Sequence, residues 1–156
     1  MTKLLSLDQA TRNTGYALFN GGHLVEYGVI KAGAADWERR IVETGNIVDD
    51  MIQTRGVDAV VIEGIEYRSN MKTYAQLASL QGVLFYVCAN NGVSCDVLSP
   101  STWRKAVGIS PVKKREEQKQ LSVTQARELF EHEFTDDEAE AVLQGVAAFK
   151  LLKQGD

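Results

Sequence analysis

Two short apolar segments, each ending in an acidic residue, constrain the fold of this chain more than any other feature. Residues 3–8 read KLLSLD and residues 58–63 read DAVVIE. Short apolar runs of this kind predict strands in the middle of a sheet that is covered on both faces. Asp8 and Glu63 then stand at the ends of their strands. If the two strands are neighbours, both carboxylates meet at one edge of the sheet.

The remaining segments predict a strand meander followed by alternating helices and strands. Further strands are predicted at residues 14–20, 24–30 and 95–98, with a Gly21-Gly22 hairpin turn between the first two. Helices are predicted at residues 36–55, 71–90 and 114–131, with a short helix starting at 99–101 and a last helix starting at Thr135. This order predicts a single α/β domain over residues 1–156, with helices on a mixed sheet.

Composition sets the broad class of the protein. A chain of 156 residues, 44% hydrophobic and 24% charged, is expected to be globular with a real core. It has no run of 18 apolar residues and no signal-peptide pattern, so we expect a cytoplasmic protein that does not enter a membrane. Cys88 and Cys95 lack metal-ligand neighbours and are expected to be reduced thiols.

The helix at residues 71–90 is apolar on almost every side. Such a helix needs cover on two sides, of which the sheet can supply one. The other side is a candidate subunit interface, because soluble monomers rarely leave large apolar patches exposed. Charged substitutions at Leu80 or Leu84 are expected to yield monomers or insoluble protein, and damage to the core would have the same effect.

Charge is distributed unevenly along the chain. The formal net charge is −4, which argues against nucleic-acid binding, but residues 97–120 carry a net charge of +4. The basic residues of this segment are Arg104, Lys105, Lys113, Lys114, Arg115 and Lys119. A local basic patch can bind phosphates on a protein whose total charge is negative. A solvated helical face is an equal alternative.

The segment FTDDEAEAVLQGVAAF, residues 134–149, adds two further candidate acids. Thr135 and Glu138 form a capping box, so the acids of the first turn are explained by the helix dipole alone. Glu140 lies in the next turn, where the dipole explains it poorly, and it shares a face with Asp137. That face continues with small residues, which would let the helix approach the sheet closely. Both acids would then approach the strand ends.

Four acids, Asp8, Glu63, Asp137 and Glu140, therefore predict a metal site. Neighbouring carboxylates repel one another, and a divalent cation removes that conflict. Hard oxygen ligands without a Cys/His cluster favour Mg²⁺ or Mn²⁺. Four carboxylates suit a two-metal phosphodiester hydrolase, with these residues as both catalytic residues and metal ligands. For each acid alone, a strand-end residue that faces water is the alternative.

In this order, the motifs resemble the RuvC family of Holliday-junction resolvases in the ribonuclease H-like superfamily, and its short bacteriophage-type members most. The similar segments are SLDQATRNTGYALF (6–19), AVVIEGIEY (59–67), AQLASLQGVLFYVCANNGV (75–93), SPSTWRKAVGI (99–109) and DDEAEAV (136–142). The chain departs from the family pattern at Gln9 and Ala10, where proline and glycine are usual. It also departs at Glu140, where the family has Asp.

The resemblance implies a ribonuclease H-like mixed five-stranded sheet flanked by helices. It implies a Mg²⁺-dependent endonuclease, with two ions per site, that resolves Holliday junctions or other branched DNA by paired symmetrical nicks. Two symmetrical cuts need a two-fold homodimer. No nucleotide cofactor is implied, and a phage protein would act in the host cytoplasm. The expected DNA-binding residues are Arg12, Tyr67, Arg68, Arg104, Lys105, Lys113, Lys114 and Lys119, with Tyr67 near the family's junction-wedging aromatic.

Two other functions stay open. One is a non-catalytic branched-DNA-binding protein of the same fold, which the presence of all four acids disfavours. The other is an actin-like or sugar-kinase ATPase, which needs a glycine-rich loop after Asp8, whereas residues 9–13 contain no glycine. Trp103 is expected to be half-buried packing beside the basic segment, with stacking on DNA as an alternative.

Overall fold

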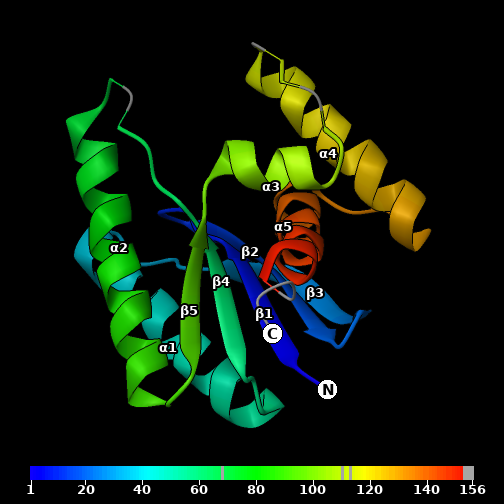
Figure 1. Cartoon of the computed structure of the whole chain (residues 1–156). Helices are drawn as coiled ribbons and strands as arrows, with labels where there is room; N and C mark the ends of the chain where they lie inside the picture. Colours follow the sequence, from blue (N-terminus) through cyan, green and yellow to red (C-terminus); the bar gives the residue numbers. More distant parts are fainter. Residues whose placement is uncertain (68, 110, 113, 153–156) are drawn as a thin grey trace.

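A computed structural model describes residues 1–67, 69–109, 111–112 and 114–152. Its strands form one sheet in the order β3-β2-β1-β4-β5 (Figure 1). The strands are β1 (Lys3–Asp8), β2 (Asn13–Asn20), β3 (His23–Lys31), β4 (Ala59–Glu63) and β5 (Ser94–Leu98). The first three form an antiparallel meander, and β4 joins β1 in parallel. The expected mixed five-stranded sheet is therefore confirmed, with the two acid-ended strands as central neighbours.

The helices cover both faces of this sheet. They are α1 (Trp37–Arg55), α2 (Met71–Asn90), α3 (Pro100–Ala106), α4 (Arg115–Phe130) and α5 (Asp136–Leu152). One core cluster joins the sheet to α1 and α2, and a second joins it to α3, α4 and α5 (Figure 1). None of the described helices is long and apolar enough to cross a membrane. Cys88 and Cys95 are both free, as expected.

Strand alternation decides which face receives the acids. Leu5 and Leu7 of β1 belong to the cluster under α1 and α2, whereas Leu4 belongs to the cluster under α5. Because side chains alternate along a strand, Asp8 falls on the α5 face. The register pairs Leu7 with Ile62, so Asp8 and Glu63 follow at the same level of the sheet.

Helix α5 lies close against the sheet. Its Gln144 is fully buried and donates hydrogen bonds to the Leu7 carbonyl (2.9 Å) and Ser6 Oγ (3.1 Å). Gly15 of β2 leaves no room for a Cβ beside the Asp137 carbonyl. The capping box forms as expected, since the Thr135 N–H donates to Glu138 Oε1 (2.9 Å). The small residues of α5 predict a close approach of this helix to the sheet, and the structure shows it.

The structure shows which side of α2 is buried. Leu80 and Leu84 are 1% and 0% exposed and pack under the sheet, so a charge there would damage the core. The large apolar residues that this helix exposes are instead Met71 (69%) at its start, Phe85 (41%) and Tyr86 (67%). Because this helix is apolar on almost every side, the spacing of its apolar residues does not indicate which side faces the core.

Candidate active site

The ends of β1 and β4 are joined by a side chain as well as by the strand ladder. Gln9 follows Asp8, and its Nε2 donates to the Glu63 carbonyl. Its Oε1 accepts from the Glu63 N–H at 3.1 Å. The amide therefore continues the pairing of the two strands past their last paired residues. Gln9 therefore holds the segment after Asp8 against the backbone of Glu63.

The four predicted acids come together at this edge. Burial raises the pKa of Asp8 well above its usual range, and the carboxylates of Glu63, Glu140 and Asp137 raise it further. Asp8, Glu63 and Asp137 also line one pocket at this edge of the sheet. Burial is also the main cause that raises the pKa of Glu63, Asp137 and Glu140. The site therefore holds concentrated negative charge in a partly dehydrated setting.

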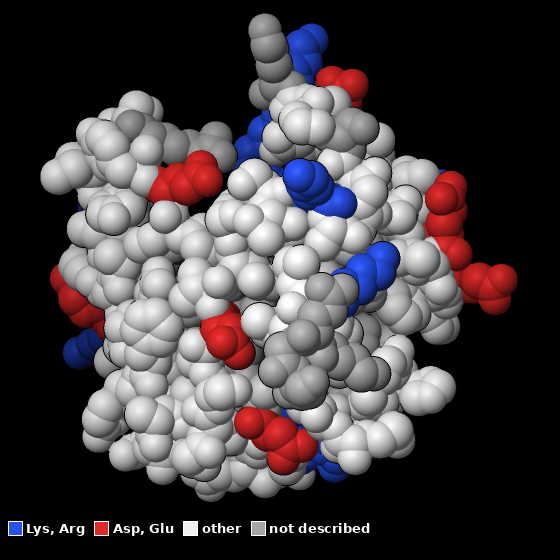
Figure 2. All heavy atoms as spheres, in the orientation of Figure 1, with Lys and Arg blue, Asp and Glu red and all other residues white. Residues whose placement is uncertain are grey.

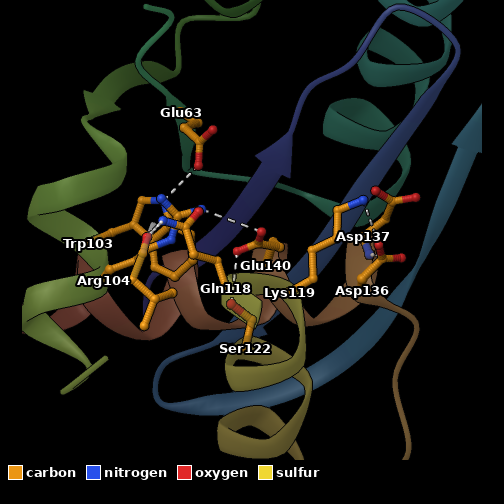
Figure 3. A network of polar contacts seen from close by, with 10 residues as sticks. Glu63, Trp103, Arg104, Gln118, Lys119, Ser122, Asp136, Asp137 and Glu140 are labelled. Atoms are coloured by element: carbon orange, nitrogen blue, oxygen red, sulfur yellow. Dashed lines mark hydrogen bonds and ion pairs between the residues drawn. The ribbon is translucent and has the colours of Figure 1, made fainter. Parts of the chain in front are cut away.

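Donors from α3 and α4 hold the two glutamates (Figure 3). Trp103 Nε1 donates to Glu63 Oε2 at 2.7 Å, and Ser122 Oγ donates to Glu140 Oε2 at 3.1 Å. Trp103 is 0% exposed. The expectation of a half-buried Trp103 that could stack on DNA is therefore wrong. The Trp103 ring packs in the hydrophobic core, and its Nε1–H contacts Glu63 in the candidate active site.

Arg104 also faces this cluster. Its Nη2 lies 3.5 Å from Glu140 Oε1, and its guanidinium lies over the Trp103 ring, 4.8 Å from the centroid. The arginine side chain is 13% exposed, and its buried Nε has no hydrogen-bond partner among the described residues. Arg104 is thus an internal cation beside a predicted metal ligand. Its predicted phosphate contact stays a prediction.

The chemistry of this donor set fits a hard divalent cation. All four candidate ligands are carboxylates, and their mutual repulsion at Asp8 is the conflict that such a cation relieves. Within the described ranges, however, no group of three or more acidic, His or Cys side chains is arranged to hold an ion. Glu63 and Glu140 instead make the hydrogen bonds and the ion pair described above.

A pocket of about 490 Å³ opens beside the acids. Asp8, Glu63 and Asp137 line it, together with the loops after β1 and β4 and the start of α2. Arg115 lines it too, and its positive charge acts against the raised pKa of all four acids. The sequence did not single out Arg115 from the other basic residues. The position of Arg115 depends on where the start of α4 lies relative to the edge of the sheet. The residues around Arg115 do not indicate that placement.

Among the described residues, the predicted DNA-binding side chains do not line this pocket. Arg12, Lys105 and Lys114 are exposed, whereas Lys119 pairs with Asp136 at 3.3 Å. Tyr67 is 56% exposed and stacks edge-on against Tyr74, a pocket residue. Arg68 and Lys113 lie outside the described residues. On the face shown in Figure 2, basic side chains form separate groups and do not merge into one patch.

Comparison with known proteins agrees with this architecture. The family model for "Crossover junction endodeoxyribonuclease RuvC" matches residues 4–147. The RuvC of Wolinella succinogenes is 35% identical over 86 residues, which cover 52% of this chain and 53% of that protein. The RuvC of Aliarcobacter butzleri is 36% identical over 86 residues, which cover 53% and 56%. The matched region thus spans about half the length of these curated relatives.

Solved structures extend the likeness to the whole fold. The chain superposes on Thermus thermophilus RuvC in complex with a Holliday junction substrate with a TM-score of 0.83 and 12% identity, covering 99% of this chain and 97% of that one. The yeast mitochondrial Holliday junction resolvase Ydc2 gives a TM-score of 0.62 at 15% identity, covering 98% and 80%. The expected ribonuclease H-like fold is thereby confirmed. Taken with the family match over residues 4–147, the acid-ended central strands place this chain in the RuvC family.

Proposed function

We propose that the chain is a metal-dependent, structure-selective endonuclease that resolves Holliday junctions or other branched DNA by paired symmetrical nicks. The observation that carries the proposal is the gathering of four carboxylates from β1, β4 and α5 at one edge of the sheet, beside a pocket that holds Arg115. Membership of the RuvC family supports the same activity, and a solved relative is described in complex with a Holliday junction substrate.

Each acid has a defined part in this proposal. Asp8 and Glu63 sit on paired central strands, so their backbone positions are rigid, and α5 brings Asp137 and Glu140 to them. These residues would hold divalent cations, Mg²⁺ or Mn²⁺ and most simply two, which supply activation of water and stabilisation of the leaving oxygen. Arg115 would orient a phosphate in the pocket, since a guanidinium can bind phosphate with two parallel hydrogen bonds.

The DNA surface is proposed around the mouth of the pocket. Exposed Arg12, Lys105 and Lys114 are suited to phosphate contacts, and Tyr67 offers an exposed ring for stacking on a base. Lys119 could join them by exchanging Asp136 for a phosphate. Arg68 and Lys113 are proposed with them, whereas Arg104, the remaining member of the set predicted from the sequence, is proposed to stay beside Glu140. The proposed nuclease domain covers residues 1–156 and acts in the cytoplasm.

A homodimer is part of the proposal. The outer side of α2 exposes Phe85 and Tyr86, and neighbouring β5 exposes Val97 at 42%. A second copy that packs on this surface would cover it and supply a second active site related by two-fold symmetry.

The direct test is cleavage of a synthetic four-way junction, with a linear duplex of the same sequence as substrate control. We expect Mg²⁺-dependent nicks at symmetrical positions on two opposed strands of the junction, and none of these on the duplex. Binding of the junction without cleavage in Mg²⁺ or Mn²⁺ would instead favour the non-catalytic junction-binding protein.

A further inference from the structure

Each glutamate of the site accepts a hydrogen bond from a neutral side chain, and Glu140 also lies 3.5 Å from the Arg104 guanidinium. Glu63 accepts a hydrogen bond from an indole N–H, and Glu140 accepts one from a hydroxyl (Figure 3). Both donors are neutral, and both come from fully buried side chains, Trp103 and Ser122. We propose that Trp103 is a positioning residue for metal binding, which holds the Glu63 carboxylate through Oε2 so that its other oxygen is available to a divalent cation. The inference rests on the proposed function.

The Trp103 donor is fixed in place by its surroundings. The Gly64 N–H donates to the Leu98 carbonyl at 2.7 Å, which ties the end of β4 to the end of β5. Helix α3 starts directly after β5, and the Ser99 side chain caps it by accepting from the Thr102 N–H at 3.2 Å. Trp103 lies in the first turns of this capped helix, with its ring in the core cluster beneath α5. Glu63 and its donor therefore belong to one rigid unit.

The free oxygen of Glu63 is the second part of the argument. Among the described residues, Oε2 has the Trp103 hydrogen bond, whereas Oε1 has no hydrogen bond. A neutral donor leaves the carboxylate charge intact, so the group can still bind a cation through Oε1. Hydrogen bonds of this kind to ligating carboxylates commonly change metal affinity by about 10- to 100-fold. Ser122 gives Glu140 a similar hydrogen bond through Oε2, whereas Glu140 Oε1 faces Arg104 at 3.5 Å.

A purely structural role is the competing explanation. A buried indole N–H needs an acceptor, and Glu63 could be no more than that acceptor. In that case, removal of the N–H would change folding stability without changing metal affinity. The two roles therefore differ in a property that can be measured without any DNA.

The test replaces the N–H without changing the shape of the ring. The chain has two tryptophans, Trp37 and Trp103, so a Trp37→Phe background leaves one indole to modify. Benzothienylalanine at position 103 keeps the tryptophan shape and lacks the donor. We expect calorimetric Mn²⁺ binding in the absence of DNA to weaken about 10- to 100-fold relative to the Trp37→Phe protein. Equal Mn²⁺ affinity in the two proteins would overturn the inference.

Two further measurements do not depend on that replacement folding well. Ser122→Ala removes only one hydroxyl and should also weaken Mn²⁺ binding. In the Trp37→Phe protein, the single indole ¹H–¹⁵N signal should shift on addition of Mg²⁺ and on Glu63→Gln substitution. A signal that moves with neither change would contradict the inference. If the unmodified protein bound no divalent cation at all, the proposed function itself would fail, which is a different result from equal affinities.

Discussion

Gln9 pairs with the backbone of Glu63 through both ends of its side-chain amide, donating to the carbonyl and accepting from the N–H. This contact joins the segment after Asp8 to the end of β4, and Gln9 itself is buried. It fixes the two strand-end acids relative to each other.

Removal of this amide should destabilise the protein and disturb the site. Gln9→Ala deletes two hydrogen bonds to a partly buried backbone, so we expect a loss of about 1–3 kcal/mol in the free energy of unfolding. Chemical denaturation measures it. Gln53→Ala, at an exposed position on α1, is the control and should change stability by less than about 0.5 kcal/mol. Equal effects of the two substitutions would show that the Gln9 contact is not formed in solution.

Asp8 should make the metal-free protein less stable as pH rises. Its folded-state pKa is raised by burial and by neighbouring carboxylates, so the folded protein binds this proton more tightly than the unfolded chain. The resulting stabilisation is fully present below the usual pKa of 3.8 and is lost as pH rises through the folded-state pKa. Asp8→Asn should therefore raise the melting temperature at neutral pH without metal, and the gain should shrink toward pH 4.

Metal addition provides the complementary measurement at this position. Mg²⁺ should raise the melting temperature of the unmodified protein, because a ligand that binds only the folded state stabilises it. Mg²⁺ should raise the melting temperature of the Asp8→Asn variant far less. An exposed control, Asp50→Asn on α1, should respond to Mg²⁺ like the unmodified protein. If Asp8→Asn melts at the unmodified temperature at neutral pH, the carboxylate cluster does not strain the metal-free fold.

Arg104 and Lys105 are neighbours in sequence that should have different roles. Arg104 is largely buried against Glu140, whereas Lys105 is exposed. We expect Arg104→Gln to tighten Mg²⁺ binding several-fold, because it removes a competing positive charge, and to leave junction affinity almost unchanged. Lys105→Gln should weaken junction binding. It should also reduce the slope of log affinity against log salt concentration by about one. Equal losses of junction affinity would mean that Arg104 leaves Glu140 to contact phosphate.

The dimer surface can be tested at Tyr86. This residue is 67% exposed on α2, outside the core, so Tyr86→Glu should preserve the fold while it separates the subunits. Sedimentation of the unmodified protein should give a dimer at micromolar concentration and that of the variant a monomer. Val42→Glu, on the exposed side of α1, should stay dimeric. A monomeric unmodified protein would leave the α2 interface without support unless junction DNA is needed for assembly.

The parts of this site that sequence predicts are those encoded locally. Apolar strands place Asp8 and Glu63, and the capping box at Thr135 fixes where α5 begins and therefore which of its acids share a face. The contacts of Trp103 and the position of Arg115 depend on where α3 and α4 cross the sheet edge. No periodicity encodes that crossing, so the sequence predicts only half-buried packing for Trp103 and does not distinguish Arg115 from the other basic residues.

Junction cleavage by a matched pair of variants at the start of α5 tests the central claim most directly. Asp137 lines the pocket beside Asp8, whereas its neighbour Asp136 pairs with Lys119. With Mg²⁺ present, Asp137→Asn should abolish cleavage of a four-way junction and keep junction binding, as should Asp8→Asn, Glu63→Gln and Glu140→Gln. Asp136→Asn should still cleave. Normal cleavage by Asp137→Asn together with loss of cleavage in Asp136→Asn would contradict the four-carboxylate site described above.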